Sequence, residues 1–203
     1  MRTTRIPLLI LLLSFWFSAA AQHGRVAGRI QDLRTKGVSF TPTHLFAASE
    51  RKQHDPLLDA ALTKGEVLQL DRGAMGRAAQ LGAEHIALAI PFEGGTLELD
   101  LARATIAEEG ENVVLASGQR STEIPGVHYR GMIRGVGGSW AAVSLFDGEL
   151  MALVNDGQGQ IVVGKFKDDA QGRYVIYRDR DLRVLPSFTC GTEDGDGAYR
   201  CMR

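Results

Sequence analysis

In the C-terminal half of the chain, apolar and polar residues alternate along short stretches that are separated by turns containing glycine. The apolar run Ser139–Phe146 meets the pair Asp147-Gly148, and Glu149–Val154 follows it. Asp-Gly between two such runs is a strong hairpin signal, because glycine tolerates the positive φ of a primed turn. A second turn, 155–159, then leads into Gln160–Phe166. The pattern predicts a β-meander.

Other segments also have strand patterns: Glu66–Leu70, His85–Ile90, Thr96–Leu101, Asn112–Ala116 and Tyr174–Tyr177. Strict alternation places Leu97, Leu99 and Leu101 on one face of their strand. Ser139–Phe146 is apolar on both faces, which is typical of a strand that is central in its sheet. We therefore expect a mainly β fold, either an antiparallel β-sandwich or a strongly curved sheet of roughly eight strands, with one or two short helices.

The clearest helix signal begins at His54. Asp55 can cap a helix and Pro56 suits its first position, since the N–H that proline lacks would be unpaired there. Apolar residues at helical spacing continue to Leu62, and Gly65 ends the segment. Residues 74–81 are ambiguous, because their alanines favour a helix and their glycines oppose it.

The N-terminus has the pattern of a secretory signal peptide. Arg2 and Arg5 precede an apolar run that is too short for a membrane span of about 20 residues, and the small residues 19–21 give a cleavage site. The chain is therefore expected to be secreted or periplasmic, with no stable membrane span. The expected organisation is a signal peptide (1–21), a poorly ordered lead-in (22–53) with a short strand near 38–40, a β-rich domain (54–189) and a Gly/Asp-rich linker or truncated tail (190–203).

The charge of the chain argues against a nucleic-acid-binding protein, and its cysteine content argues against a small domain stabilised by disulfide bonds. Removing Arg2 and Arg5 from the 23 basic residues leaves 21 against 24 acidic residues, a net charge of −3. Nucleic-acid binders carry a basic excess instead. The two cysteines, Cys190 and Cys201, both follow the predicted domain, so its stability must come from burial and not from disulfide bonds.

The sequence contains no complete active-site motif. No two of the five histidines have the His-Glu-x-x-His spacing of a catalytic zinc site, and lone histidines in β-rich sequence are mostly structural or exposed. The stretch nearest to a nucleophile elbow, 137–140, lacks the second glycine of Gly-x-Ser-x-Gly. The acidic stretch 193–197 lacks the ligand spacing of an EF-hand loop. We predict no catalytic residues and no cofactor for this chain.

Cys190 is the residue for which the sequence suggests a specific chemical role, as a zinc ligand. A cysteine thiolate binds zinc well, so Cys190 on an extended segment could fill the open position of a catalytic zinc in a partner enzyme. The alternative is a disulfide between Cys190 and Cys201, which is natural in an exported protein. The residues alone leave both interpretations open.

The predicted meander resembles a known family. The order of its features is similar to that in the propeptides of secreted, bacterial reprolysin (adamalysin-like) zinc metalloproteases. The features are His128–Gly131, Gly135, Ser139 and the apolar run to Phe146, the returning strand Gly148–Leu153, Gly164–Phe166 and Tyr174–Tyr177. Cys190-Gly191 resembles the cysteine switch of these proteins, although the usual Pro-x-x-Cys-Gly spacing is one residue longer here, from Pro186. The resemblance is best over 128–192 and looser over 65–127.

The resemblance implies a non-catalytic pro-domain that assists the folding of a reprolysin-like metalloprotease and inhibits it. Zinc would belong to the protease, in cis in a longer chain or in trans, and Cys190 would be its ligand. No catalytic domain follows before Arg203, which leaves open a truncated product, an incomplete sequence or a free-standing domain. The alternative function is a stand-alone secreted β-module that binds a protein or envelope partner and carries a Cys190–Cys201 disulfide.

Overall fold

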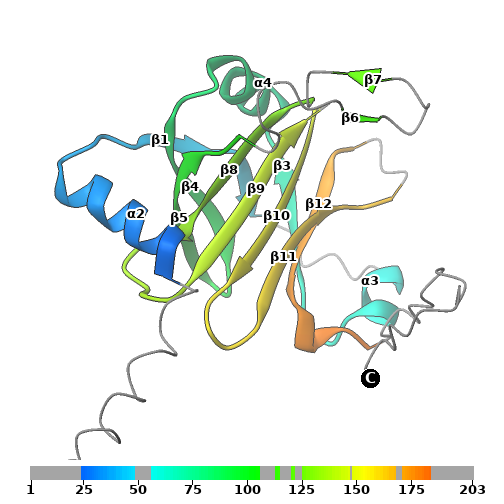
Figure 1. The fold of residues 1–203 in the computed structure, drawn as a ribbon. Coiled ribbons are helices and arrows are strands. Elements are labelled where there is room, and N and C mark those ends of the chain that lie inside the picture. The colour runs from blue at the N-terminus through cyan, green and yellow to red at the C-terminus, as the bar shows by residue number, and fades with distance from the viewer. Residues whose placement is uncertain are drawn as a thin grey trace, which may run out of the picture.

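The computed structural model describes residues 24–48, 56–105, 113–114, 120–121, 125–146, 148–167 and 171–183 (Figure 1). The fold is mainly β, as the sequence predicts, and is built on one large sheet. Its strands are β1 (Thr41–His44), β2 (Phe46–Ala48), β3 (Glu66–Leu70), β4 (His85–Phe92), β5 (Gly95–Arg103), β8 (Val127–Ile133), β9 (Trp140–Phe146), β10 (Glu149–Asn155), β11 (Gln160–Lys165) and β12 (Arg173–Arg178). The short strands β6 (Val113–Val114) and β7 (Arg120–Ser121) pair separately.

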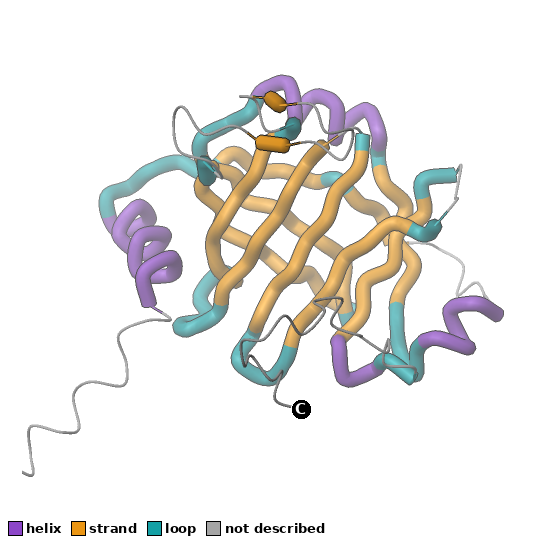
Figure 2. The backbone as a smooth tube through the Cα atoms, turned by 45° about the vertical axis from the view of Figure 1, so that its right-hand side comes forward, coloured by secondary structure: helices purple, strands orange, loops and turns teal. Residues whose placement is uncertain are grey.

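The large sheet curves until its two ends almost meet. Its strand order is β1-β4-β5-β8-β9-β10-β11-β12-β3-β2. The two end strands, β1 and β2, are consecutive in the chain and only Leu45 separates them. The chain therefore passes from one edge of the sheet to the other and nearly closes it into a barrel, which the tube of Figure 2 shows. Of the predicted alternatives, the curved sheet is the one that the chain adopts.

The predicted meander forms the wall of the barrel. Strands β8 to β12 are neighbours in chain order, and each pair is antiparallel. Phe146 pairs with Glu149 across the β9–β10 hairpin, and Gly148 has a φ of 75°, as a primed turn requires. Asp147 itself lies outside the described residues. β9 lies between β8 and β10, so its predicted central position is confirmed.

The interior of the barrel is filled with apolar side chains. Alternate residues of each strand point inward, which follows from the period of two along a β-strand. Leu97, Leu99 and Leu101 all belong to this core, as their alternation predicts. Tyr129 and Tyr174 are the largest side chains that are fully buried. The interior of the barrel is therefore a packed apolar core.

Within the described residues, three α-helices accompany the sheet. The predicted helix is α3 (Pro56–Ala61), and the ambiguous segment is α4 (Arg72–Leu81). Asp71 caps α4 by accepting a hydrogen bond from the N–H of Ala74, and Gly82 ends it in the left-handed conformation. α4 crosses one end of the barrel and buries Met75 in the core (Figure 1). The third helix, α2 (Gly24–Thr35), packs on the outer face of β5 and β8. Among the described residues, no helix has the length and apolar character needed to cross a bilayer.

The expected lead-in is the part of the sequence prediction that the fold corrects most. Residues 24–48 form α2, β1 and β2, and β1 begins after the strand that was expected near 38–40. Glycine at positions 24 and 28 weakens the helix signal of α2, and packing compensates for it. The side chains of Ala27 and Ile30 pack in a second buried apolar cluster outside the barrel, together with Phe40, Ala102 and Met132.

Candidate functional site

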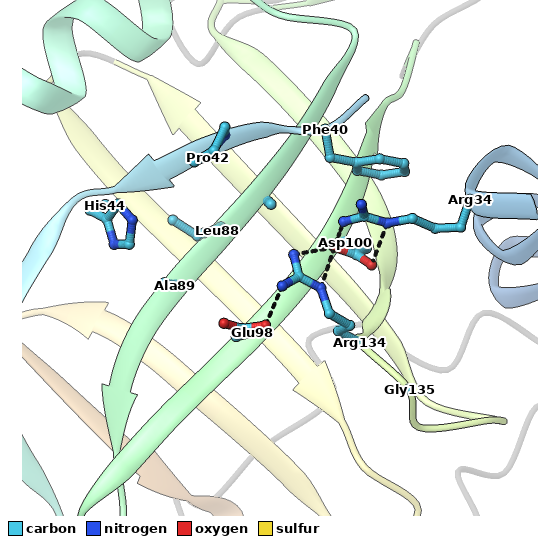
Figure 3. Close-up of a pocket in the computed structure, with 11 residues that line it drawn as sticks. Arg34, Phe40, Pro42, His44, Leu88, Ala89, Glu98, Asp100, Arg134 and Gly135 are labelled. Carbon is cyan, nitrogen blue, oxygen red and sulfur yellow. Dashed lines mark hydrogen bonds and ion pairs between the residues drawn. The ribbon is translucent and has the colours of Figure 1, made fainter. Parts of the chain in front are cut away.

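A cleft of about 530 Å³, the Asp100 groove, lies on the outer face of the barrel beside α2 (Figure 3). Ala87 and Ala89 of β4 line its floor with short apolar side chains. Longer side chains from α2, from β1 and from the segment after β8 form its walls. The lining residues are Arg34, Phe40, Pro42, His44, Ala87, Leu88, Ala89, Glu98, Asp100, Arg134 and Gly135.

The alternation of β5 explains why a carboxylate lies at the centre of this groove. Leu99 and Leu101 point into the barrel, so Glu98 and Asp100 point outward. The Asp100 side chain is nevertheless only 4 % exposed, because α2 and two guanidinium groups cover it. A buried carboxylate requires charged partners, and the groove supplies them.

Asp100 joins two arginines that are distant in sequence. Arg34, near the end of α2, donates from Nε to Oδ2 at 2.9 Å and from Nη2 to Oδ1 at 2.5 Å. Arg134, one residue after β8, donates to Oδ1 from Nε at 3.1 Å and from Nη2 at 2.8 Å. Arg134 also donates to Glu98. The dashed lines of Figure 3 trace this cluster, whose four charges sum to zero.

The arginines keep Asp100 ionised. Burial raises the pKa of Asp100, but hydrogen bonds from Arg34 and Arg134 outweigh burial and hold the pKa below its ordinary value. The hydrogen bonding between Arg134 and Asp100 also raises the pKa of Arg134 above its ordinary value. Asp100 is therefore ionised at neutral pH and holds both guanidinium groups in place.

The rest of the groove suits binding. The Arg34 guanidinium lies 4.0 Å from the centre of the Phe40 ring, a cation–π contact that fixes one wall. Pro42 and His44 of β1 are exposed along the opposite side. The described residues that line the groove include no hydroxyl, thiol or amine side chain that could serve as a nucleophile. The groove therefore presents a charge-neutral cluster of paired side chains, held in place, beside short apolar side chains.

A second ion-pair cluster braces three segments. Arg178 of β12 makes two hydrogen bonds to Glu93 and one to Asp156. Hydrogen bonding by Arg178 lowers the pKa of Glu93, and the hydrogen bonds to Asp156 outweigh its burial and lower its pKa too. Glu93 has a φ of 51° in the β4–β5 turn, so the ion pair holds a residue in a conformation that favours glycine. We interpret this cluster as structural.

Of the three described histidines, His44 is exposed along the Asp100 groove, and the other two contact neighbouring side chains or backbone. His128 interacts through Nδ1 with Ser144 Oγ at 2.9 Å and through Nε2 with the Pro125 carbonyl at 3.1 Å. His85 lies against the ring of Phe40. In the part of the chain that the structure describes, no three His, Cys, Asp or Glu side chains are grouped to hold a metal ion.

Cys190 and Cys201 lie outside the described residues, as do the predicted signal peptide (1–21) and the predicted tail (190–203). The structure does describe the segment that leads toward them. Arg183 donates its backbone N–H to the Ala61 carbonyl and its Nε to the Leu62 carbonyl, both at 2.8 Å. Leu182 forms a bridge with Leu62. The chain therefore leaves β12 at a point that is fixed to the segment after α3.

Comparison with known proteins gives no identification. No protein-family model matches the chain, and no curated protein matches it.

Sequence reasoning did not find the Asp100 groove. The sequence offered one signal, an Asp in a strand whose inward positions are all Leu, next to Glu98. Its partner Arg34 belongs to a segment that the sequence predicts as poorly ordered. The cluster exists only because the barrel brings α2 against β5.

Proposed function

We propose that this chain is an exported, non-catalytic pro-domain that assists the folding of a reprolysin-like zinc metalloprotease and inhibits it through Cys190. The family resemblance of the meander supports the identity of the partner. A thiolate binds zinc at about 2.3 Å and can occupy the position that a catalytic zinc keeps open for water. The Cys190 side chain is the proposed inhibitory ligand, and the barrel is the body that docks on the protease.

The fixed exit of the chain at Arg183 is the observation that carries this proposal. Cys190 follows Arg183 by seven residues, a length that spans at most about 25 Å when fully extended. A barrel bound to the protease would therefore hold the thiolate at a high effective concentration near the zinc. The same short tether requires the docking surface to lie within that distance of the active site.

Inhibition of the protease that the adjoining gene or reading frame encodes tests the proposal. Its hydrolysis of a fluorogenic peptide is titrated with the full chain and with the Cys190→Ser and Cys201→Ser variants. We expect the full chain and Cys201→Ser to inhibit similarly and Cys190→Ser to inhibit at least tenfold more weakly. The absence of inhibition by the full chain, or equal inhibition by Cys190→Ser, would overturn the proposal.

The second candidate is a stand-alone secreted β-module with a Cys190–Cys201 disulfide. The Asp100 groove favours it, because a groove with charged side chains held in place beside short apolar ones can bind a protein or envelope partner without any protease. Thiol titration of the purified protein under non-reducing conditions separates the two candidates. The module requires both cysteines to be oxidised to each other, whereas the inhibitory switch requires a free thiol at Cys190.

A further inference from the structure

A second cleft, the basic groove, lies at the other end of α2 from Arg34. Its volume is about 600 Å³. Arg29 of α2, Arg103 at the end of β5 and Arg130 of β8 line it, together with a single acidic residue, Glu84. The groove is distinct from the Asp100 groove, whose arginines are already paired with Asp100.

The packing of α2 brings the three arginines together. Ala102 of β5 and Arg130 of β8 are partners in the sheet, and Arg103 follows directly along β5. Ile30 of α2 is buried in the same cluster as Ala102, which places its neighbour Arg29 over the ends of these strands. The convergence of charge is therefore a property of the fold and is not visible in the sequence.

The charges of the basic groove are poorly compensated. Arg103 Nη1 donates to the Gly82 carbonyl at 3.3 Å and lies 3.8 Å from a carboxylate oxygen of Glu84; the two side chains are 49 % and 73 % exposed. Within the described residues, the side chains of Arg29 and Arg130 make no hydrogen bond or ion pair, in contrast to those of Arg34 and Arg134. Three guanidinium groups against one carboxylate give this groove a local charge of +2, in a chain whose net charge is −1.

We propose that the basic groove binds a carboxylate-rich segment of a protein partner. Guanidinium groups recognise carboxylates through paired hydrogen bonds. The three arginines come from separate elements, so they suit several carboxylates that are spaced along a peptide. A compact phosphate site usually adds free backbone N–H groups. Here the N–H groups of Arg103 and Ala104 are already bonded to the carbonyls of Glu84 and His128.

This binding activity does not depend on Cys190 or on a zinc protease. It concerns different residues from the proposed inhibitory switch, and it is measured without any enzyme. Loss of inhibition by Cys190→Ser and loss of peptide binding by the groove variant would therefore be separate results.

Fluorescence anisotropy with a labelled hexaglutamate peptide tests the proposal. The full chain is compared with the double variant Arg29→Gln/Arg130→Gln in 20 mM salt. We expect the double variant to bind at least tenfold more weakly. Both arginines are exposed and lack partners in the described structure, so the substitutions should leave the thermal unfolding midpoint unchanged.

Two controls distinguish the groove from general charge attraction. Lys64→Gln/Arg77→Gln removes the same charge from exposed positions elsewhere, and we expect it to change the Kd by less than twofold. A hexaglutamine peptide should not bind. The proposal is wrong if hexaglutamate does not bind the full chain, or if the two double variants weaken its binding equally. It is also wrong if inorganic phosphate binds the groove more tightly than the peptide does and with the same sensitivity to Arg29→Gln/Arg130→Gln.

Discussion

Arg34 donates from two nitrogen atoms to the two carboxylate oxygens of Asp100, which lies 66 residues further along the chain. The pair fastens α2 to the outer face of β5. Arg134 approaches the same carboxylate from the segment after β8. Three segments of the chain therefore depend on one buried charge, and both grooves are formed by α2 in the position that this charge helps to hold.

The substitution Asp100→Asn should lower the free energy of unfolding by about 2–3 kcal/mol, because two guanidinium groups would lose their counter-ion at a buried position. Glu98→Gln is the matched control in the same strand. Its ion pair with Arg134 is 46 % and 42 % exposed, so its loss should cost less than about 1 kcal/mol. Urea unfolding of both variants measures the difference. Equal effects would show that Asp100 is not the centre of the cluster.

Acid should weaken the same cluster. The pKa of Asp100 is lowered in the folded state, while the unfolded chain has the ordinary value of about 3.9. The carboxylate therefore contributes stability above pH 4, and this contribution is lost as the pH falls through the folded-state pKa. Urea midpoints between pH 6 and pH 2 should fall more steeply for the natural protein than for Asp100→Asn. Parallel curves would contradict this assignment.

Local patterns were sufficient to predict most of the barrel wall. The alternation of Leu97, Leu99 and Leu101 identifies the buried face of β5, and the glycine-containing turns locate the hairpins of the meander. These signals work because strand period and turn geometry act over a few residues. The closure of the barrel was not predictable in this way. Closure depends on the pairing of β1 with β4 and of β2 with β3, near opposite ends of the sheet. The sequence of residues 41–48 contains no pattern that identifies these partner strands.

The two grooves could not be predicted from the sequence either, because they too depend on contacts between distant segments. Arg29 and Arg34 belong to a segment with two helical glycines and a weak apolar pattern, which favours an irregular structure. Its helix is stabilised by tertiary packing of Ile30 against β5 and β8. Charged residues that are brought together only by such packing have no characteristic spacing in the sequence. Cys190, by contrast, was visible in the sequence but lies outside the described residues.

Closure of the barrel should depend on Leu45, which joins β1 to β2 and is 1 % exposed. Leu45→Ala would leave a cavity at the seam, and we expect it to lower the free energy of unfolding by about 2–5 kcal/mol. Leu81→Ala provides the control, since Leu81 is 67 % exposed and its truncation should change stability by less than about 0.5 kcal/mol. Thermal unfolding followed by circular dichroism measures both. A small effect at Leu45 would indicate that the seam does not contribute to the core.

The close contact of β5 and β8 should make Gly131 intolerant of any side chain. A Cβ at this position would lie 1.9 Å from the Asp100 carbonyl oxygen, so the strands would have to move apart. We expect Gly131→Ala to cost at least about 2–3 kcal/mol. Gly164→Ala, in another strand of the sheet, meets open space and should leave stability unchanged or raise it by about 0.5 kcal/mol. Similar urea midpoints for the two variants would contradict the close approach.

A buried hydroxyl supports the start of β10. Tyr174 Oη accepts a hydrogen bond of 3.0 Å from the N–H of Leu150, and both residues are almost fully buried. Tyr174→Phe keeps the ring but leaves that N–H without a partner, so the free energy of unfolding should fall by about 1–3 kcal/mol. Amide hydrogen exchange at Leu150 should also become faster.

Tyr177 in the same strand supplies the control for this prediction. Burial raises its pKa, but within the described residues its hydroxyl makes no hydrogen bond. Removal of a hydroxyl that makes no hydrogen bond to the described residues should change stability by less than about 0.5 kcal/mol, so Tyr177→Phe isolates the contribution of the Leu150 contact. If the two variants unfold at the same urea concentration, the Tyr174 hydroxyl does not support the hairpin. If only Tyr174→Phe is destabilised, the β9–β10 hairpin of the meander is held in place by a side chain from β12 as well as by its own turn.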